Sequence, residues 1–259
     1  MTNGPSLLLN IVDSVATLTI ARPAKRNALD TAAWQALAET CAAIAVNGDV
    51  RAVVLQGEGA HFSAGADIHE LREYIRDTAW MAYNQDAIAR ALDTFAALPQ
   101  PTIAVIRGVC YGGGAALAAA SDFRLCTTDA TFAITPSKLG LTYRLVDCLR
   151  VVELVGAARA REILLLAKEV DAATAVTWGM VTECVEPASL PSALAATLAK
   201  MTSLSSYSVR GIKQSLLKIR VGQTNDDAQT KQIFADAFKG QDFAEGAAAF
   251  VEKRTPEFD

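Results

Sequence analysis

The chain has 259 residues, of which 51% are hydrophobic and 20% charged, and its formal net charge is −4. This composition is typical of a globular protein, and the slight acidity excludes the basic surface that binds nucleic acid or anionic membranes. No apolar run reaches the roughly 20 residues of a transmembrane helix, and the first basic residue is Arg22, which disfavours a signal or transit peptide.

Five cysteines and two histidines are scattered without the spacing of a metal site or a disulfide framework. This pattern indicates a reduced protein with no metal ion. We therefore expect a cytoplasmic protein that binds neither nucleic acid nor membrane.

The first half of the chain alternates between predicted strands and helices. Residues 7–12 and 15–20 are β-rich runs that Asp13 and Ser14 separate, as in a hairpin. Asp30 or Thr31 would cap a helix that runs to about residue 46. Further strands are predicted at 52–56, 102–106 and 123–126, with helices at about 69–76 and 80–97. Strands joined by helical crossovers imply an α/β fold with a parallel sheet and ligand sites at the strands' carboxyl ends.

After Pro136 the pattern is almost wholly helical, apart from a short strand at 181–185. No linker or low-complexity stretch divides the chain. We take residues 1–189 as the core and residues 190–259 as a C-terminal helical region. Helices are predicted at about 144–155, 158–167, 172–178, 190–202, 205–219, 224–238 and 242–253.

The first glycine turn, residues 62–68 with the sequence FSAGADI, joins a predicted strand to a predicted helix. Its small residues let a ligand approach the main chain, and a helix start leaves backbone N–H groups unpaired. One such N–H could be half of an oxyanion hole, which needs two converging donors. Taken alone, the turn is better explained as a tight connection without chemistry.

The second glycine turn, residues 108–116 with the sequence GVCYGGGAA, repeats this design. It follows the strand at 102–106 and opens a small-residue helix at 115–120. Two such turns on neighbouring strands would direct two N–H donors at one point. A glycine triplet by itself also fits close helix packing.

Three more segments accompany these turns: RPAKRNAL at 22–29, which we call the N-terminal turn, GMV at 179–181, and a C-terminal stretch at 245–256. In this order and spacing, the five segments resemble the enoyl-CoA hydratase/isomerase (crotonase) superfamily over nearly the whole chain. The resemblance implies a spiral of stacked ββα turns and a C-terminal helical region that builds a homotrimer or a dimer of trimers. A bundle packed on its own subunit is the alternative for these helices.

The resemblance also implies roles for individual residues. The oxyanion donors would be the N–H groups of Ala66 and Gly113. Coenzyme A would arrive as part of an acyl-CoA substrate, with no tightly bound cofactor. Phe250 and Lys253 would share one helical face and reach the CoA of an adjacent subunit. The other residues expected to contact CoA are Ala24, Lys25, Ala64, Asp67 and Ile68, of which Asp67 would also cap the next helix.

Two positions depart from the family pattern. Where hydratases of this family have their two glutamates, this chain has Ala116 and Pro136. Adding water to an enoyl thioester requires one group to activate the water and another to manage the α-proton. Alanine and proline can do neither, so the usual hydratase mechanism is disfavoured.

Residues 132–143 resemble instead the methylmalonyl-CoA decarboxylase branch of the superfamily. Residues 63–71 resemble it too, although Ala66 replaces that branch's histidine. Losing CO2 from a malonyl-type thioester forms the enolate directly, so no base has to remove a C–H proton. Thr135 and Tyr143 would position the carboxylate and deliver the later proton, although each could equally be structural. We expect a decarboxylase-type lyase.

Two alternatives stay open. Asp147 lies four residues after Tyr143, on the same helical face, and could serve as a relocated carboxylate in a hydratase or isomerase. It could equally pair with Arg144 or Arg150. The second alternative is a non-catalytic acyl-CoA binder, because both family glutamates are absent.

Overall fold

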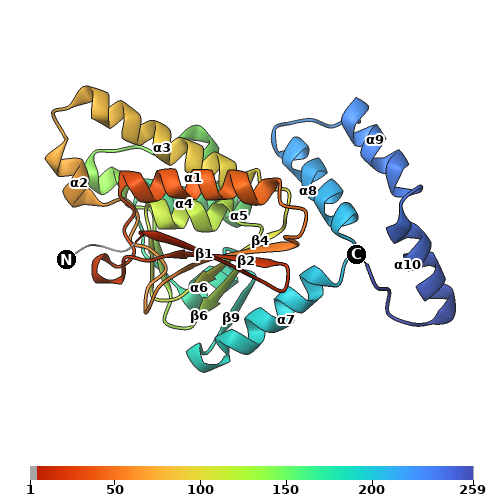
Figure 1. The fold of residues 1–259 in the computed structure, drawn as a ribbon. Helices are drawn as coiled ribbons and strands as arrows, with labels where there is room; N and C mark the ends of the chain where they lie inside the picture. Colours follow the sequence, from red (N-terminus) through yellow and green to blue (C-terminus); the bar gives the residue numbers. More distant parts are fainter. Residues whose placement is uncertain (1–4, 259) are drawn as a thin grey trace.

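A six-stranded sheet forms the centre of the computed structural model, which describes residues 5–258 (Figure 1). The strand order is β1-β2-β3-β4-β6-β9, and all neighbours are parallel except the β1–β2 hairpin. The hairpin turns at Asp13 and Ser14, as predicted, and both have positive φ. The strands are β1 (Leu7–Val12), β2 (Val15–Ile20), β3 (Ala52–Gly57), β4 (Thr102–Ile106), β6 (Phe123–Thr127) and β9 (Glu183–Val185).

The central strands are buried on both faces because helices cover the sheet on both sides (Figure 1). Val53 and Leu55 face the main core, which also contains apolar residues of α1 (Thr31–Ala45), α3 (Thr78–Ala96) and α4 (Gly113–Ala120). Val54 points the other way, towards α7 (Leu190–Thr202). Alternate side chains of one strand therefore enter two separate cores, as a pleated strand requires.

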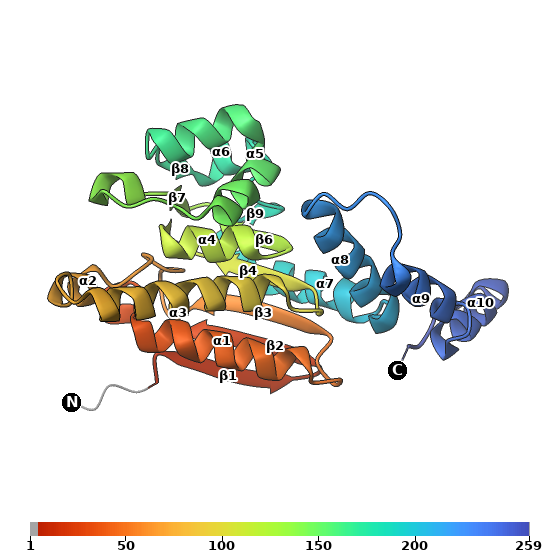
Figure 2. The same ribbon diagram turned by 90° about the horizontal axis from the view of Figure 1, so that it is seen from above.

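Figure 2 shows α1, α3, α4 and α5 lying side by side in chain order above the sheet. Each successive crossover adds one strand to this sheet, and one or two helices lie between successive strands. The helices predicted at 144–155 and 158–167 are the two halves of α5 (Leu145–Leu165), which is kinked between them, so the prediction of two helices is confirmed. Gly156 interrupts it with a non-helical backbone (φ 74°, ψ 162°).

A second, three-stranded sheet was not predicted. It consists of β5 (Val109–Tyr111), β7 (Thr131–Ala133) and β8 (Val170–Asp171). Each strand has only two or three residues, too few to show an alternating pattern. Next to it, Ser63 pairs with Cys110 in an isolated parallel bridge, which brings the first glycine turn against the second.

The remaining helical segments before residue 190 are short. The predicted helix at 69–76 is α2 (Ile68–Glu73), and that at 172–178 is α6 (Ala172–Thr177). Three 3-10 turns each begin with proline, whose fixed φ suits a first helical position. They are η1 (Pro23–Lys25), η2 (Pro136–Leu139) and η3 (Pro187–Ser189).

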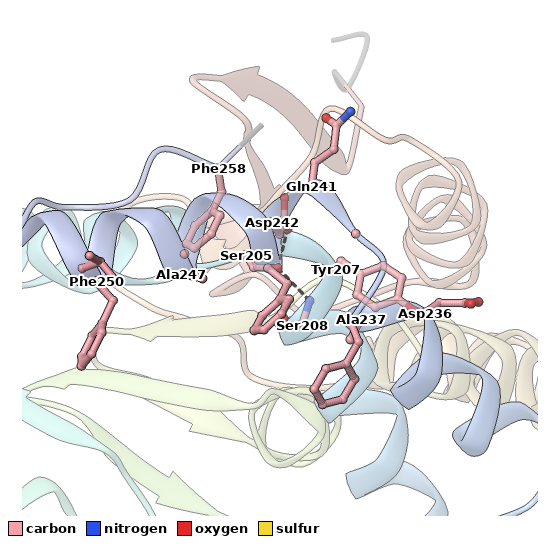
Figure 3. Close-up of a pocket in the computed structure, with 15 residues that line it drawn as sticks. Ser205, Tyr207, Ser208, Asp236, Ala237, Gln241, Asp242, Ala247, Phe250 and Phe258 are labelled. Atoms are coloured by element: carbon pink, nitrogen blue, oxygen red, sulfur yellow. Dashed lines mark hydrogen bonds between the residues drawn. The ribbon is translucent and has the colours of Figure 1, made fainter.

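The last three helices, α8 (Ser206–Arg220), α9 (Ala228–Ala237) and α10 (Gln241–Glu252), extend away from the sheet (Figures 1 and 2). A cavity of about 780 Å³ opens among them, with Phe250 and Phe258 on its wall (Figure 3). α8 contacts the core through the buried Lys213, whose Nζ donates to the Gln100 carbonyl oxygen at 2.8 Å and lies 2.6 Å from Asp122 Oδ2. Many apolar side chains of the three helices nevertheless stay exposed. These are Tyr207, Ile212, Leu216, Ile219, Phe234, Phe238, Phe243, Phe250 and Val251. Between residues 5 and 258, no helix has the length and apolar character needed to cross a membrane.

Candidate active site

Asn27 fixes the N-terminal turn. Its side chain is fully buried, and its Nδ2 donates to the carbonyl oxygens of Glu58 at 2.9 Å and His61 at 2.7 Å. Its Oδ1 accepts from the Arg22 N–H at 3.0 Å. Asn27 also has a left-handed backbone (φ 56°), which asparagine tolerates better than most residues. Sequence reasoning assigned Asn27 no role, although its place in a turn motif was a signal.

Ser63 and Gly65 shape the first glycine turn. The Ser63 hydroxyl donates to the Asn27 carbonyl at 2.8 Å and accepts from the Gly65 N–H at 3.1 Å. Gly65 has φ 94°, and a Cβ there would lie 2.8 Å from the Gly113 nitrogen and 2.9 Å from the Tyr111 carbonyl oxygen. Only glycine allows the two turns to approach this closely.

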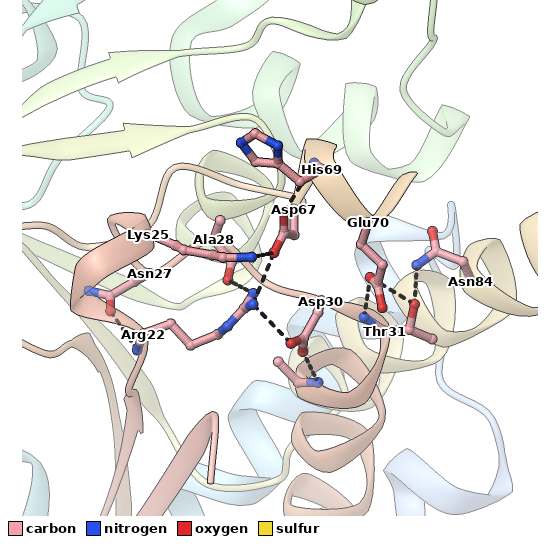
Figure 4. Close-up of polar contacts among 11 residues, drawn as sticks. Arg22, Lys25, Asn27, Ala28, Asp30, Thr31, Asp67, His69, Glu70 and Asn84 are labelled. Atoms are coloured by element: carbon pink, nitrogen blue, oxygen red, sulfur yellow. Dashed lines mark hydrogen bonds and ion pairs between the residues drawn. The ribbon is translucent and has the colours of Figure 1, made fainter. Parts of the chain in front are cut away.

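Asp67 joins the first glycine turn to the N-terminal turn (Figure 4). It caps α2 as predicted, accepting from the His69 N–H at 3.1 Å. The same buried carboxylate lies 2.9 Å from Arg22 Nη2 and 2.7 Å from Lys25 Nζ. Burial alone would raise the pKa of Asp67, but hydrogen bonds and charges from Lys25 and Arg22 lower it to about 2. Asp67 therefore stays ionised, and Lys25 is an ion-paired group.

The expected CoA contacts of these two turns lie at one rim of the site. Lys25 reaches Asp67, and the Ala64 N–H donates to the Arg26 carbonyl at 2.9 Å. Ala24, Lys25 and Ile68 are exposed, and Ala64 is half-buried. The rim thus offers a ligand both charge and apolar contact.

The N–H groups of Ala66 and Gly113 approach each other across the two glycine turns. A Cβ built on Gly113 would lie 3.6 Å from the Ala66 nitrogen. Gly113 is the first residue of α4, and its N-cap, Gly112, has no side chain to accept a hydrogen bond. Neither N–H donates to any acceptor within residues 5–258. Two unpaired main-chain donors from separate turns therefore lie close together.

The glycine triplet also serves packing. A Cβ on Gly113 would lie 2.9 Å from the buried Trp34 ring, and one on Gly114 would lie 2.7 Å from the Ser63 carbonyl oxygen. Close packing, which the sequence left open as an explanation of the triplet, is thus part of its role.

Tyr143 and Thr135 both lie at the second glycine turn. The Tyr143 hydroxyl donates to the Gly112 carbonyl oxygen. Thr135 Oγ1 lies 3.7 Å from where a Cβ on Gly112 would be, and it has no hydrogen bond within the described chain. Burial and the Asp147 charge raise the pKa of Tyr143 well above its ordinary value of 10.0, so the phenol keeps its proton. That proton is directed at a backbone carbonyl.

Asp147 is held between two arginines. Its carboxylate is buried and lies 2.9 Å from Arg144 Nε and 2.5 Å from Arg150 Nη1. Arg144 also pairs with Asp93 of α3 at 2.7 Å. The ion-paired role that the sequence left open is therefore present, and both carboxylate oxygens of Asp147 already have partners.

Phe250 and Lys253 lie far from the glycine turns of their own chain. Both views place α10 at the opposite end of the molecule from α2 (Figures 1 and 2). The expectation that the two residues share a helical face is wrong, because α10 ends at Glu252 and Lys253 has a left-handed backbone (φ 57°). The sequence pattern predicted a helix up to residue 253, one residue beyond the end of α10.

The family model described as enoyl-CoA hydratase/isomerase matches residues 10–259. The chain belongs to the enoyl-CoA hydratase/isomerase family. The predicted superfamily is thereby confirmed.

Similar proteins and structures align with nearly the whole of this chain. The "probable enoyl-CoA hydratase echA8" of Mycobacterium tuberculosis (strain CDC 1551 / Oshkosh) is 28% identical over 254 residues, covering 98% of this chain and 97% of the relative. The mitochondrial Delta(3,5)-Delta(2,4)-dienoyl-CoA isomerase of Mus musculus is 32% identical over 247 residues, covering 90% and 75%. A crystal structure of a putative enoyl-CoA hydratase/isomerase family protein from Hyphomonas neptunium has 31% identity and a TM-score of 0.93, covering 98% and 97%. The predicted crotonase-like spiral is confirmed as the fold of this family member.

Replacing Asp67 tests the link between the two turns. Because its pKa is lowered from 3.8 to about 2, its stabilising effect is fully present above pH 3.8 and is lost as the pH falls through about 2. We expect Asp67→Asn to lower the free energy of unfolding by about 2 kcal/mol at pH 7, and by progressively less below pH 4. Urea unfolding at several pH values measures this. Asp86→Asn, at an exposed position of α3, is the control. An equal effect of Asp67→Asn at pH 7 and pH 3 would contradict the assignment.

Proposed function

We propose that the protein acts on an acyl-CoA thioester and stabilises its enolate oxygen between the N–H groups of Ala66 and Gly113. The proximity of these two unpaired donors supports the proposal most directly. Such donors bind a developing oxyanion more strongly than a neutral carbonyl, and that difference accelerates a reaction. The enzyme needs no tightly bound cofactor, because coenzyme A belongs to the substrate.

Coenzyme A would bind at the rim formed by the N-terminal turn and the first glycine turn. The paired Lys25 ammonium is half-exposed and can still meet a phosphate, while Ala64 and Ile68 offer apolar contact. The names of the relatives favour this substrate class, since they are enoyl-CoA and dienoyl-CoA enzymes.

Those names also favour hydration or isomerisation over decarboxylation. Hydration needs two acid–base groups, and Ala116 and Pro136 supply neither. Moving a double bond needs only one group, which takes a proton from one carbon and returns it to another. Asp147 is the remaining candidate, and it would have to release one of its two arginines to act. Isomerisation of an unsaturated acyl-CoA is therefore our first candidate reaction.

Decarboxylation of a malonyl- or methylmalonyl-type CoA ester is the second candidate. In this reaction the bond to the carboxylate breaks, its electron pair forms the enolate, CO2 leaves, and a proton is added at the α-carbon. The observation that favours it is Thr135, whose half-buried hydroxyl lies beside Gly112 without a hydrogen bond inside the described chain. Thr135 could orient the carboxylate, and no base is required.

A product assay with 3-hexenoyl-, crotonyl- and methylmalonyl-CoA separates the candidates. For an isomerase, Asp147→Asn should lower kcat on 3-hexenoyl-CoA by about 10²- to 10⁴-fold, because the proton-transferring group is lost. Asp93→Asn is a matched control, since Asp93 binds the same Arg144 from an exposed position. Methylmalonyl-CoA turnover that survives Asp147→Asn would identify the decarboxylase instead. Binding of all three esters without products would identify a non-catalytic binder.

Two substitutions at Gly113 test the oxyanion donor. Gly113→Pro removes the N–H at a helix position that accepts proline, whereas Gly113→Ala adds a Cβ at the same place and keeps the N–H. We expect kcat of Gly113→Pro to be lower than that of Gly113→Ala by about 10²- to 10³-fold. Circular dichroism confirms that both variants fold. Equal rates in the two folded variants would remove Gly113 from the proposed site.

We also propose that α8, α9 and α10 assemble the chain into a trimer or a dimer of trimers. The support is their exposed apolar faces and the 780 Å³ cavity among them, together with the prevalence of closed symmetry in oligomers.

Sedimentation velocity tests this assembly. Phe250→Asp should dissociate the oligomer, because it places a charge within an apolar contact. Val46→Asp is the control, since Val46 is as exposed (86%, against 84% for Phe250) but lies at the end of α1. A monomeric wild type at micromolar concentration would refute the assembly.

A further inference from the structure

Tyr143 makes its hydrogen bond to the Gly112–Gly113 peptide group, whose N–H is one of the two proposed oxyanion donors. Its hydroxyl donates to the Gly112 carbonyl oxygen, which also accepts the Ala116 N–H at 3.0 Å. The Gly112 carbonyl and the Gly113 N–H belong to one planar peptide unit. Whatever binds the oxygen of this unit therefore acts on its N–H as well.

Two physical effects follow from this connection. A hydrogen bond to a carbonyl oxygen draws electron density towards the oxygen, and the N–H of the same amide becomes a stronger donor. Because the unit is planar, fixing the oxygen also fixes the direction of the N–H. Gly112 has an unusual backbone (φ 50°, ψ −116°). The Ala116 N–H holds its carbonyl oxygen from within α4, and Tyr143 adds a second donor from outside that helix.

Tyr143 is itself held in place. The next residue, Arg144, is the N-cap of α5 and pairs with Asp93 on α3 at 2.7 Å and with Asp147 at 2.9 Å. The Tyr143 ring packs against the main core. Since the phenol keeps its proton, the hydroxyl remains a donor at neutral pH.

We propose that Tyr143 is a positioning residue that orients the Gly112–Gly113 peptide and strengthens the Gly113 N–H as an oxyanion donor. This inference rests on the proposed function and deepens it. It replaces the role expected from the sequence, in which Tyr143 would orient a carboxylate or deliver a proton, because its O–H is directed at the Gly112 oxygen. The residue acts through the main chain and does not touch the substrate.

The test measures carbonyl polarisation directly. Butyryl-CoA labelled with ¹³C at the thioester carbonyl is a saturated probe, and difference infrared spectroscopy reports its C=O stretch when bound. The wild type should shift this band to lower frequency than in free butyryl-CoA. In Tyr143→Phe the shift should be smaller by about 10–30%, with a similar dissociation constant. For the substrate that the product assay identifies, kcat should fall by about 2- to 8-fold.

Tyr111→Phe is the matched control. Tyr111 directly precedes Gly112 in the same turn, but its hydroxyl donates to Glu169 at 2.5 Å. Removing that hydroxyl should leave the carbonyl band unchanged. If Tyr143→Phe does not fold, 3-fluorotyrosine incorporated at position 143 provides a stronger donor and should increase the shift.

The outcomes separate this inference from the proposed function. A full band shift in folded Tyr143→Phe overturns the inference and leaves the oxyanion site intact. A loss of kcat above 100-fold with an unchanged band also overturns it, because that result identifies a proton donor. No shift in the wild type overturns the proposed oxyanion site itself, and the inference with it.

Discussion

The structure depends on the close approach of two backbone turns. At Gly65 and Gly114 an added Cβ would lie within 3 Å of main-chain atoms of the opposite turn, so the turns meet only because these positions lack side chains. The Ser63–Cys110 bridge continues the same contact into the small sheet. A side chain at either position would force the turns apart and disturb the approach of the Ala66 and Gly113 N–H groups.

Polar groups with little access to solvent hold the surrounding segments in place. Asn27 fastens the N-terminal turn, Asp67 binds it to the first glycine turn, and Asp147 binds the start of α5. Breaking a fully buried pair, such as that of Asp147 with Arg150, costs about 3–5 kcal/mol when one charge remains unpaired. Each pair therefore specifies one arrangement of loops that have little apolar surface of their own.

The sequence predicted the features that depend on local patterns. The long strands, the hairpin at Asp13 and the two strand–glycine–helix turns all follow from periodicity and turn chemistry. A cap at Asp30 or Thr31 was also predicted, and Asp30 is the cap. It did not reveal β5, β7 and β8, which are too short to show a period. The partners of Asp147 and Tyr143 were also hidden, because three-dimensional packing decides which of several neighbours a side chain reaches. The decarboxylase branch rested on short motifs, and the relatives' names favour other reactions of the family.

A main-chain N–H donates a hydrogen bond whatever the side chain at that position is. The donor and the shape of the side chain can therefore change independently, which is not so when a side chain itself is the donor. Any residue except proline supplies an N–H, so Ala66 can be exchanged for a larger side chain without removing its donor. Gly113 has no such freedom, because the Trp34 ring occupies the space a side chain would need. In the proposed site, a substitution at position 66 would therefore change the surroundings of the acyl group, whereas the backbone donor to the oxyanion would be retained.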